Sequence, residues 1–166
     1  MELHLHWPHW QQHQVDWPAA AVSGFAAGAV LMVIELLWAA FGGSSPWATS
    51  HSIAAIVLGP GVHGDSNFDA NIVAMGLAIH YVLGIAFGLA LGAALSPFLP
   101  GWGLREMVPM GAVFGVILYV LNFYALVPLF PWFADLRGVP AFVGHLVFGV
   151  SAALLYWKLQ RRGARR

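Results

Sequence analysis

Four polar side chains interrupt long apolar stretches of the chain and are the first candidates for chemistry. They are Glu35, His80, Asn122 and His145. A lone carboxylate in hydrocarbon is costly unless it has a partner, and a histidine can accept or share a proton near neutral pH. These residue types therefore predict a proton-responsive or ion-binding centre between helices. The alternative is an interhelical hydrogen-bond clamp, in which Glu35 and Asn122 bond to the two histidines.

The histidines also support haem and metal hypotheses. One histidine on each of two helices can serve as an axial haem ligand, so a haem held by His80 and His145 is a further alternative. Near the N-terminus, imidazole groups that could bind a divalent metal ion occur at His4, His6, His9 and His13. The same segment is also typical of an aromatic and polar belt at a membrane interface.

No catalytic constellation is recognisable among these side chains. An enzyme that works by covalent catalysis needs a nucleophile, a base and a group that orients the base. The chain has no cysteine, which excludes disulfides, thiolate metal sites and cysteine nucleophiles. The sequence therefore predicts no catalytic residue and a protein that is not an enzyme.

Composition defines the elements that must position the polar side chains. The chain has 166 residues, of which 60% are hydrophobic and only 8% are charged, with a mean hydropathy of +0.74. Soluble domains carry about a quarter charged residues, so the sequence predicts an integral membrane protein in a lipid bilayer. The seven basic and seven acidic residues cancel, which argues against a nucleic-acid partner.

Hydropathy predicts an all-α membrane protein with four transmembrane helices, arranged as two tandem hairpins. A span needs about 20 apolar residues, so the stretch 52–58 is too short and is expected as part of an interfacial helix after the first span. The expected divisions are an interfacial arm rich in histidine and tryptophan at 1–18, a bundle at 19–157 with spans at about 19–42, 71–95, 107–129 and 139–157, and a basic tail at 158–166.

The two expected hairpins share a sequence pattern that resembles an internal repeat. Gly24 and Gly28 precede Glu35, and Gly111 and Gly115 precede Asn122 at the same spacing. The second span of each hairpin also carries a histidine four residues before a glycine. Such small-residue stripes allow helices to approach closely. The expected packing glycines are Gly24, Gly28, Gly84, Gly88, Gly92, Gly111, Gly115 and Gly149.

The four polar side chains are expected at a similar depth. At about 1.5 Å of rise per residue, each lies roughly 10–15 Å from the end of the bundle opposite the chain termini. That end carries a single arginine, Arg137, whereas the other end carries six of the seven basic residues. The positive-inside rule therefore predicts that both termini are cytoplasmic.

Several stretches resemble a known group of proteins. They are Ser45-Pro46-Trp47, the run 53–60 (IAAIVLGP), Asn122-Phe-Tyr124, Phe130-Pro-Trp-Phe133 and the run 145–149 (HLVFG). On these stretches the chain resembles an uncharacterised family of small four-helix bacterial inner-membrane proteins that often carry the automatic label "sodium:proline symporter". The resemblance covers roughly residues 20–157. It implies an architecture and a bacterial inner-membrane location, and it assigns no activity and no site residues.

Two functions follow as expectations. The first is a non-catalytic membrane subunit that associates through its small-residue helix faces, either with other membrane subunits in a larger complex, such as a respiratory one, or with copies of itself. The second is a small proton- or ion-linked transport or relay protein that uses the intramembrane cluster. The two differ in what they require of Glu35, because only the second needs its titratable group.

Overall fold

The computed structural model describes residues 14–42, 44–65 and 67–163, and this part of the chain is built of helices without strands. The expected fold class is confirmed. The long helices are α1 (Trp17–Gly42), α3 (Ala70–Leu95), α4 (Leu104–Val120) and α5 (Val139–Gly163), and the short apolar helix α2 (Ala48–Leu58) follows α1.

Each long helical segment is long and apolar enough to cross a membrane. The helices α1 and α3 have 26 residues each, or about 39 Å at 1.5 Å per residue. The third segment comprises α4 and a π-helical turn, η3 (Leu121–Ala125), which continues it. This is the architecture of a helical membrane protein.

The helices begin where polar side chains replace missing backbone partners. The Asp69 carboxylate accepts hydrogen bonds from the backbone amides of Asn71 (2.8 Å) and Ile72 (3.1 Å) at the start of α3. The Asp16 carboxylate accepts from the Ala19 amide at 2.9 Å at the start of α1. Free amides at a helix start need such acceptors, and these two carboxylates supply them.

Two segments differ from their expected bounds. The third begins at Leu104 rather than 107, because Glu106 accepts a hydrogen bond from the Gly103 amide (2.7 Å) and so begins the helix before the apolar run. It ends at Ala125 rather than 129, since Pro128 disfavours helix in the residue before it. The fourth continues through the expected tail to Gly163, where the Arg161 guanidinium stacks on Trp157 at 4.6 Å.

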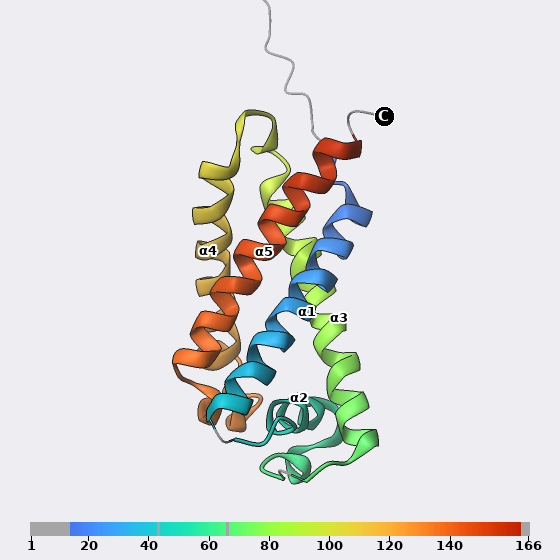
Figure 1. The fold of residues 1–166 in the computed structure, drawn as a ribbon, viewed down its shortest axis with the longest axis vertical. Helices are drawn as coiled ribbons and strands as arrows, with labels where there is room; N and C mark the ends of the chain where they lie inside the picture. The colour runs from blue at the N-terminus through green and yellow to red at the C-terminus, as the bar shows by residue number, and fades with distance from the viewer. Residues whose placement is uncertain (1–13, 43, 66, 164–166) are drawn as a thin grey trace, which may run out of the picture.

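The helices form two hairpins that meet along α1 and α5. In Figure 1, α1 and α3 run antiparallel with α2 lying across their lower end, and α4 and α5 form the second antiparallel pair. The helix α1 packs against both α3 and α5. The start of α1 and the end of α5 therefore lie at the end of the bundle opposite α2 (Figure 1).

Glycines lie at the crossing points of both hairpins. A Cβ atom added at Gly24 would lie 2.8 Å from the Cα of Gly88 and would overlap the carbonyl oxygen of Gly84. A Cβ atom added at Gly111 would lie 2.7 Å from the Cα of Val150, with the backbone of Gly149 equally close. Only glycine permits this approach of the two backbones.

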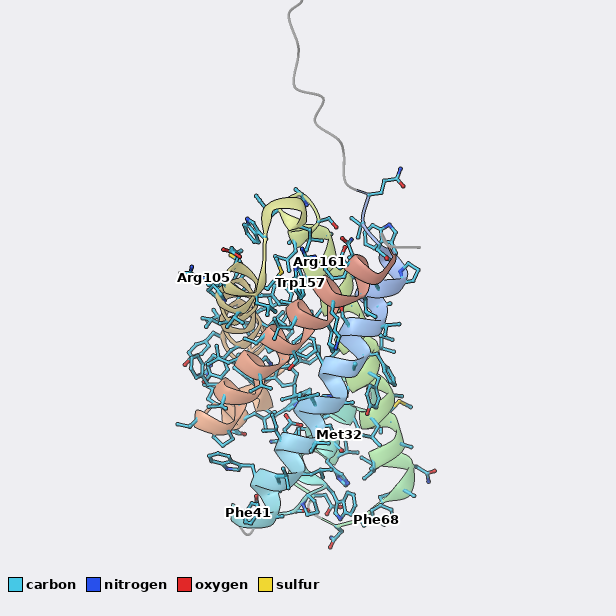
Figure 2. All side chains as sticks on the ribbon, turned by 45° about the horizontal axis from the view of Figure 1, so that its top comes forward. Met32, Phe41, Phe68, Arg105, Trp157 and Arg161 are labelled. Carbon is cyan, nitrogen blue, oxygen red and sulfur yellow. The ribbon has the colours of Figure 1, made fainter. Side chains whose placement is uncertain are left out.

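The largest fully buried apolar side chains lie toward the end with the chain termini. Leu91, Leu95, Met107 and Tyr156 are fully buried there. The Tyr156 hydroxyl is hydrogen-bonded to the hydroxyl of Ser96 at 2.7 Å. Figure 2 shows Arg105, Trp157 and Arg161 toward this end.

The opposite end of the molecule, near α2, differs in composition. Figure 2 shows Phe41 and Phe68 there, and the polar connections on either side of α2 also lie at this end. Large apolar side chains such as Phe25, Val82 and Ile117 are exposed along the sides of the bundle. Such a surface suits a lipid bilayer.

Candidate intramembrane polar site

The four polar side chains singled out from the sequence line one cavity. The cavity has a volume of about 100 Å³ and receives Glu35 from α1, His80 from α3, Asn122 from the π-helical turn η3 and His145 from α5. This volume is large enough for several water molecules. The remaining wall is mostly apolar and includes Leu31, Leu83, Phe87, Leu118 and Phe148.

His145 is held by two hydrogen bonds that define its tautomer. Its Nδ1 lies 2.8 Å from the carbonyl oxygen of Ala141, which can only accept, so Nδ1 carries the proton. In the neutral ring, Nε2 is then an acceptor, and it lies 3.0 Å from the Asn122 amide nitrogen, which donates. Asn122 and His145 therefore have the geometry of an interhelical clamp.

Asn122 lies in the π-helical turn η3. A π-helical turn contains an extra residue and occurs often at functional sites. Here it interrupts the third span at Leu121–Ala125. The glycine spacing in the sequence does not predict this change in helix geometry.

His80 binds backbone and not Glu35. Its Nε2 lies 2.9 Å from the carbonyl oxygen of Gly28 and must donate to it. A Cβ atom at Gly28 would lie 3.5 Å from the same Nε2, so the ring lies over a position without a side chain. The hydrogen bond between Glu35 and a histidine, which the clamp hypothesis required, is therefore not formed. The Nδ1 atom of His80 has no hydrogen bond to any described residue.

Glu35 is half-buried and has no hydrogen bond or ion pair with any described residue. It also lines a second, larger hollow of about 610 Å³, which we name the outer groove. The outer groove lies between the end of α1, the start of α2 and the segment 135–141. Because the cavity and the groove also share Thr49, Phe123 and Leu136, Glu35 lies between the two hollows.

Sequence reasoning missed two polar residues of α2. Thr49 lines both hollows, and its hydroxyl has no hydrogen bond to a described residue. His51 is fully buried, and neither ring nitrogen has a partner within the described chain. Both lie in the connection between spans, where hydropathy gives no signal that a polar residue will become buried.

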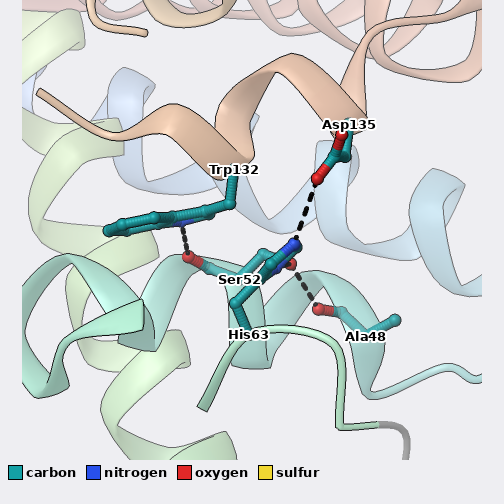
Figure 3. A network of polar contacts seen from close by, with 5 residues as sticks. All are labelled: Ala48, Ser52, His63, Trp132 and Asp135. Carbon is teal, nitrogen blue, oxygen red and sulfur yellow. Dashed lines mark hydrogen bonds and ion pairs between the residues drawn. The ribbon is translucent and has the colours of Figure 1, made fainter. Parts of the chain in front are cut away.

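A polar network closes the α2 end of the bundle (Figure 3). The indole N–H of Trp132 donates to the carbonyl oxygen of Ser52 at 2.9 Å. The Ser52 hydroxyl donates to the carbonyl oxygen of Ala48, so Nδ1–H of His63 donates to the Ser52 oxygen at 3.0 Å. The His63 Nε2 lies 3.5 Å from a carboxylate oxygen of Asp135. The network joins α2 to the 3₁₀ segment η4 (Pro131–Leu136).

The cluster fits neither a haem nor a divalent metal ion. No group of three or more histidine, cysteine or acidic residues in the described chain is arranged to hold a metal ion. Both nitrogens of His145 are engaged, and a cavity of about 100 Å³ is much smaller than a porphyrin. The candidate metal ligands His4, His6, His9 and His13 lie outside the described residues.

Fold and site together define a helical membrane protein with a polar cavity between its helices. Comparison with protein-family models, with curated proteins and with solved structures finds no match to this chain.

Proposed function

We propose that this chain is a small proton-linked relay or transport protein that works through Glu35. The proposal is supported above all by one observation. Four helical segments contribute polar side chains to a single cavity, and the one acidic side chain among them has no hydrogen bond or ion pair with a described residue. An ionisable residue inside a membrane is costly to keep, so it marks an ion or proton path more often than a packing site.

The hydrogen bonds indicate separate roles for the four residues. Asn122 and His145 satisfy one another and so fix the cavity wall. The Nδ1 atom of His80, which has no hydrogen bond to a described residue, offers an acceptor for a proton, and the Glu35 carboxyl group can release or accept one. Water in the cavity would connect the two groups.

We further propose that the chain lies in a bacterial inner membrane with both termini cytoplasmic. The location depends on the family resemblance. The orientation is supported by Arg105, Lys158 and Arg161 at the end opposite α2 and by a single arginine, Arg137, at the α2 end of the described chain. In this orientation the outer groove opens to the outside.

The alternative role as a membrane subunit has weaker support. That role requires glycine stripes that are exposed and can contact a partner subunit or a second copy of the chain. Gly24, Gly84 and Gly88 pack against each other within the chain, and Gly111, Gly115 and Gly149 do the same. A partner subunit, respiratory or otherwise, or a second copy would have to bind large apolar side chains instead. Native mass spectrometry of protein extracted gently from its membrane would report such partners.

Proton flux in liposomes tests the first proposal. Purified protein is reconstituted with a pH-sensitive dye inside, and a potassium diffusion potential drives proton entry. We expect Glu35→Gln to abolish the flux while preserving the fold, because it removes the titratable group and keeps the shape. The matched control is Glu106→Gln at the opposite end, which should retain wild-type flux. Equal flux in the wild type and Glu35→Gln, or none above empty liposomes, would overturn the proposal.

A further inference from the structure

Arg137 is the only lysine or arginine at the α2 end of the described chain. The other described lysine and arginine side chains lie at the opposite end of the bundle. They are Arg105 at the start of α4 and Lys158 and Arg161 near the end of α5. Arg137 lies directly after the 3₁₀ segment η4 and lines the outer groove. The groove therefore holds a positive charge at an end of the molecule that otherwise has none from lysine or arginine.

The guanidinium of Arg137 is fixed in place but not neutralised. Its Nε–H donates to the carbonyl oxygen of Phe123 at 2.7 Å, and its central carbon lies 4.3 Å from the centroid of the Tyr124 ring. The Nη1 and Nη2 groups have no hydrogen bond or ion pair with a described residue. Asp135 is only two residues away, yet it faces His63 at 3.5 Å. Two N–H₂ groups thus remain available for an anion.

The groove has the size and the walls of a small-molecule site. Its volume of about 610 Å³ lies within the usual range for such sites. Trp38, Pro46 and Trp47 supply an apolar wall, and Glu35 lies where the groove meets the inner cavity. The groove thus combines a fixed cation, an apolar surface and two acidic side chains, Glu35 and Asp135, of which Asp135 faces His63.

We propose that the outer groove binds a small organic carboxylate, with its anionic group on Arg137 and its apolar body against Trp38 and Trp47. An arginine fork suits a carboxylate because it can donate two parallel hydrogen bonds. The inference extends the proposed function and rests on it for the coupled proton. In that step the O–H bond at Glu35 breaks and an O–H bond forms on the bound carboxylate, which leaves a neutral acid, and the Glu35 carboxylate then takes up one proton from the solvent. No oxidant or reductant is required.

Benzoate is the probe for this site, with benzamide as its uncharged counterpart. Saturation-transfer NMR on the protein in nanodiscs of zwitterionic lipid measures the binding of each compound. We expect benzoate to bind and benzamide to bind about tenfold or more weakly, as the loss of a charge-assisted hydrogen-bonded pair implies. Arg137→Gln should remove the preference for benzoate. Arg137→Lys should keep part of it, because the charge remains and the fork is lost. The control Arg105→Gln should bind like the wild type.

The comparison of the two ligands in the wild type does not depend on any variant folding. Equal binding of benzoate and benzamide, or unchanged benzoate binding in a folded Arg137→Gln protein, would overturn the proposed site. Benzoate binding that takes up protons in the wild type but not in Glu35→Gln would support the coupling, and equal proton uptake in both would refute it. Benzoate binding that depends on Arg137, without any proton flux in liposomes, would support the proposed binding site and overturn the proposed proton relay.

Discussion

The two hairpins carry the same pattern of residues but use it differently. In the hairpin of α4 and α5, Asn122 and His145 bond to each other at 3.0 Å. In the hairpin of α1 and α3, His80 turns to the Gly28 carbonyl at 2.9 Å, and Glu35 has no hydrogen bond or ion pair among the described residues. One copy of the pattern is a satisfied clamp, whereas in the other the carboxyl group does not bond to the histidine.

The place where the helices cross accounts for the difference. The α4–α5 backbones meet at Gly115, where a Cβ atom would lie 2.9 Å from the Cα of Leu146 and would overlap the carbonyl oxygen of His145. No room remains for an imidazole ring over Gly115. The Nδ1–H group of His145 therefore donates to the carbonyl oxygen of Ala141 in its own helix. The closest approach of α1 and α3 lies one turn before Gly28, and the His80 ring fills the space over Gly28. Equivalent residues thus acquire different partners because the crossing point moves by one turn.

The largest effect is expected at the equivalent glycines. Gly115→Ala should destabilise the protein by about 2 kcal/mol, because the added methyl group would force two backbones apart. Gly28→Ala should cost nothing measurable, since the nearest atom to its methyl group would lie 3.5 Å away. Unfolding of both variants in mixed micelles, followed by circular dichroism, measures the difference. Equal destabilisation would show that the two crossings are alike.

A smaller effect is expected at the equivalent polar positions. Asn122→Leu should cost about 1 kcal/mol, because it leaves His145 without its donor. Glu35→Leu should not lower stability, since the carboxyl group has no hydrogen bond to lose within the described part of the chain. The same unfolding measurement compares the two. A loss in Glu35→Leu as large as that in Asn122→Leu would indicate that both hairpins are clamps.

The smallest effect is expected at the tryptophans that follow each proline, Trp47 and Trp132. Trp132→Phe removes the indole hydrogen bond to the Ser52 carbonyl and should cost about 0.5 kcal/mol. Trp47→Phe should be close to neutral, because its indole nitrogen has no hydrogen bond within the described chain and a phenylalanine ring can keep the contact with Phe68. Hydrogen exchange in α2 should rise in Trp132→Phe alone. A matching rise in Trp47→Phe would contradict the asymmetry.

Much of the candidate site could be predicted from the chain because a membrane makes polar residues conspicuous. In stretches as apolar as these, Glu35 and His145 stand out by type alone, and counting residues from the helix ends placed them at one depth. Thr49 and His51 could not be found in this way. They lie in a polar connection, and only the packing of α2 across the end of the bundle buries His51 and brings Thr49 to the cavity.

By itself the sequence determined an all-helical membrane architecture, because apolar length and the need to satisfy backbone groups in lipid permit little else. It also indicated four polar side chains, Glu35, His80, Asn122 and His145, that line one cavity between the helices. Only the tertiary structure decided how they pair, because partner choice depends on helix rotation and crossing point. A shift of one turn in the crossing separates the Asn122–His145 pair from Glu35, which has no hydrogen bond to a described residue.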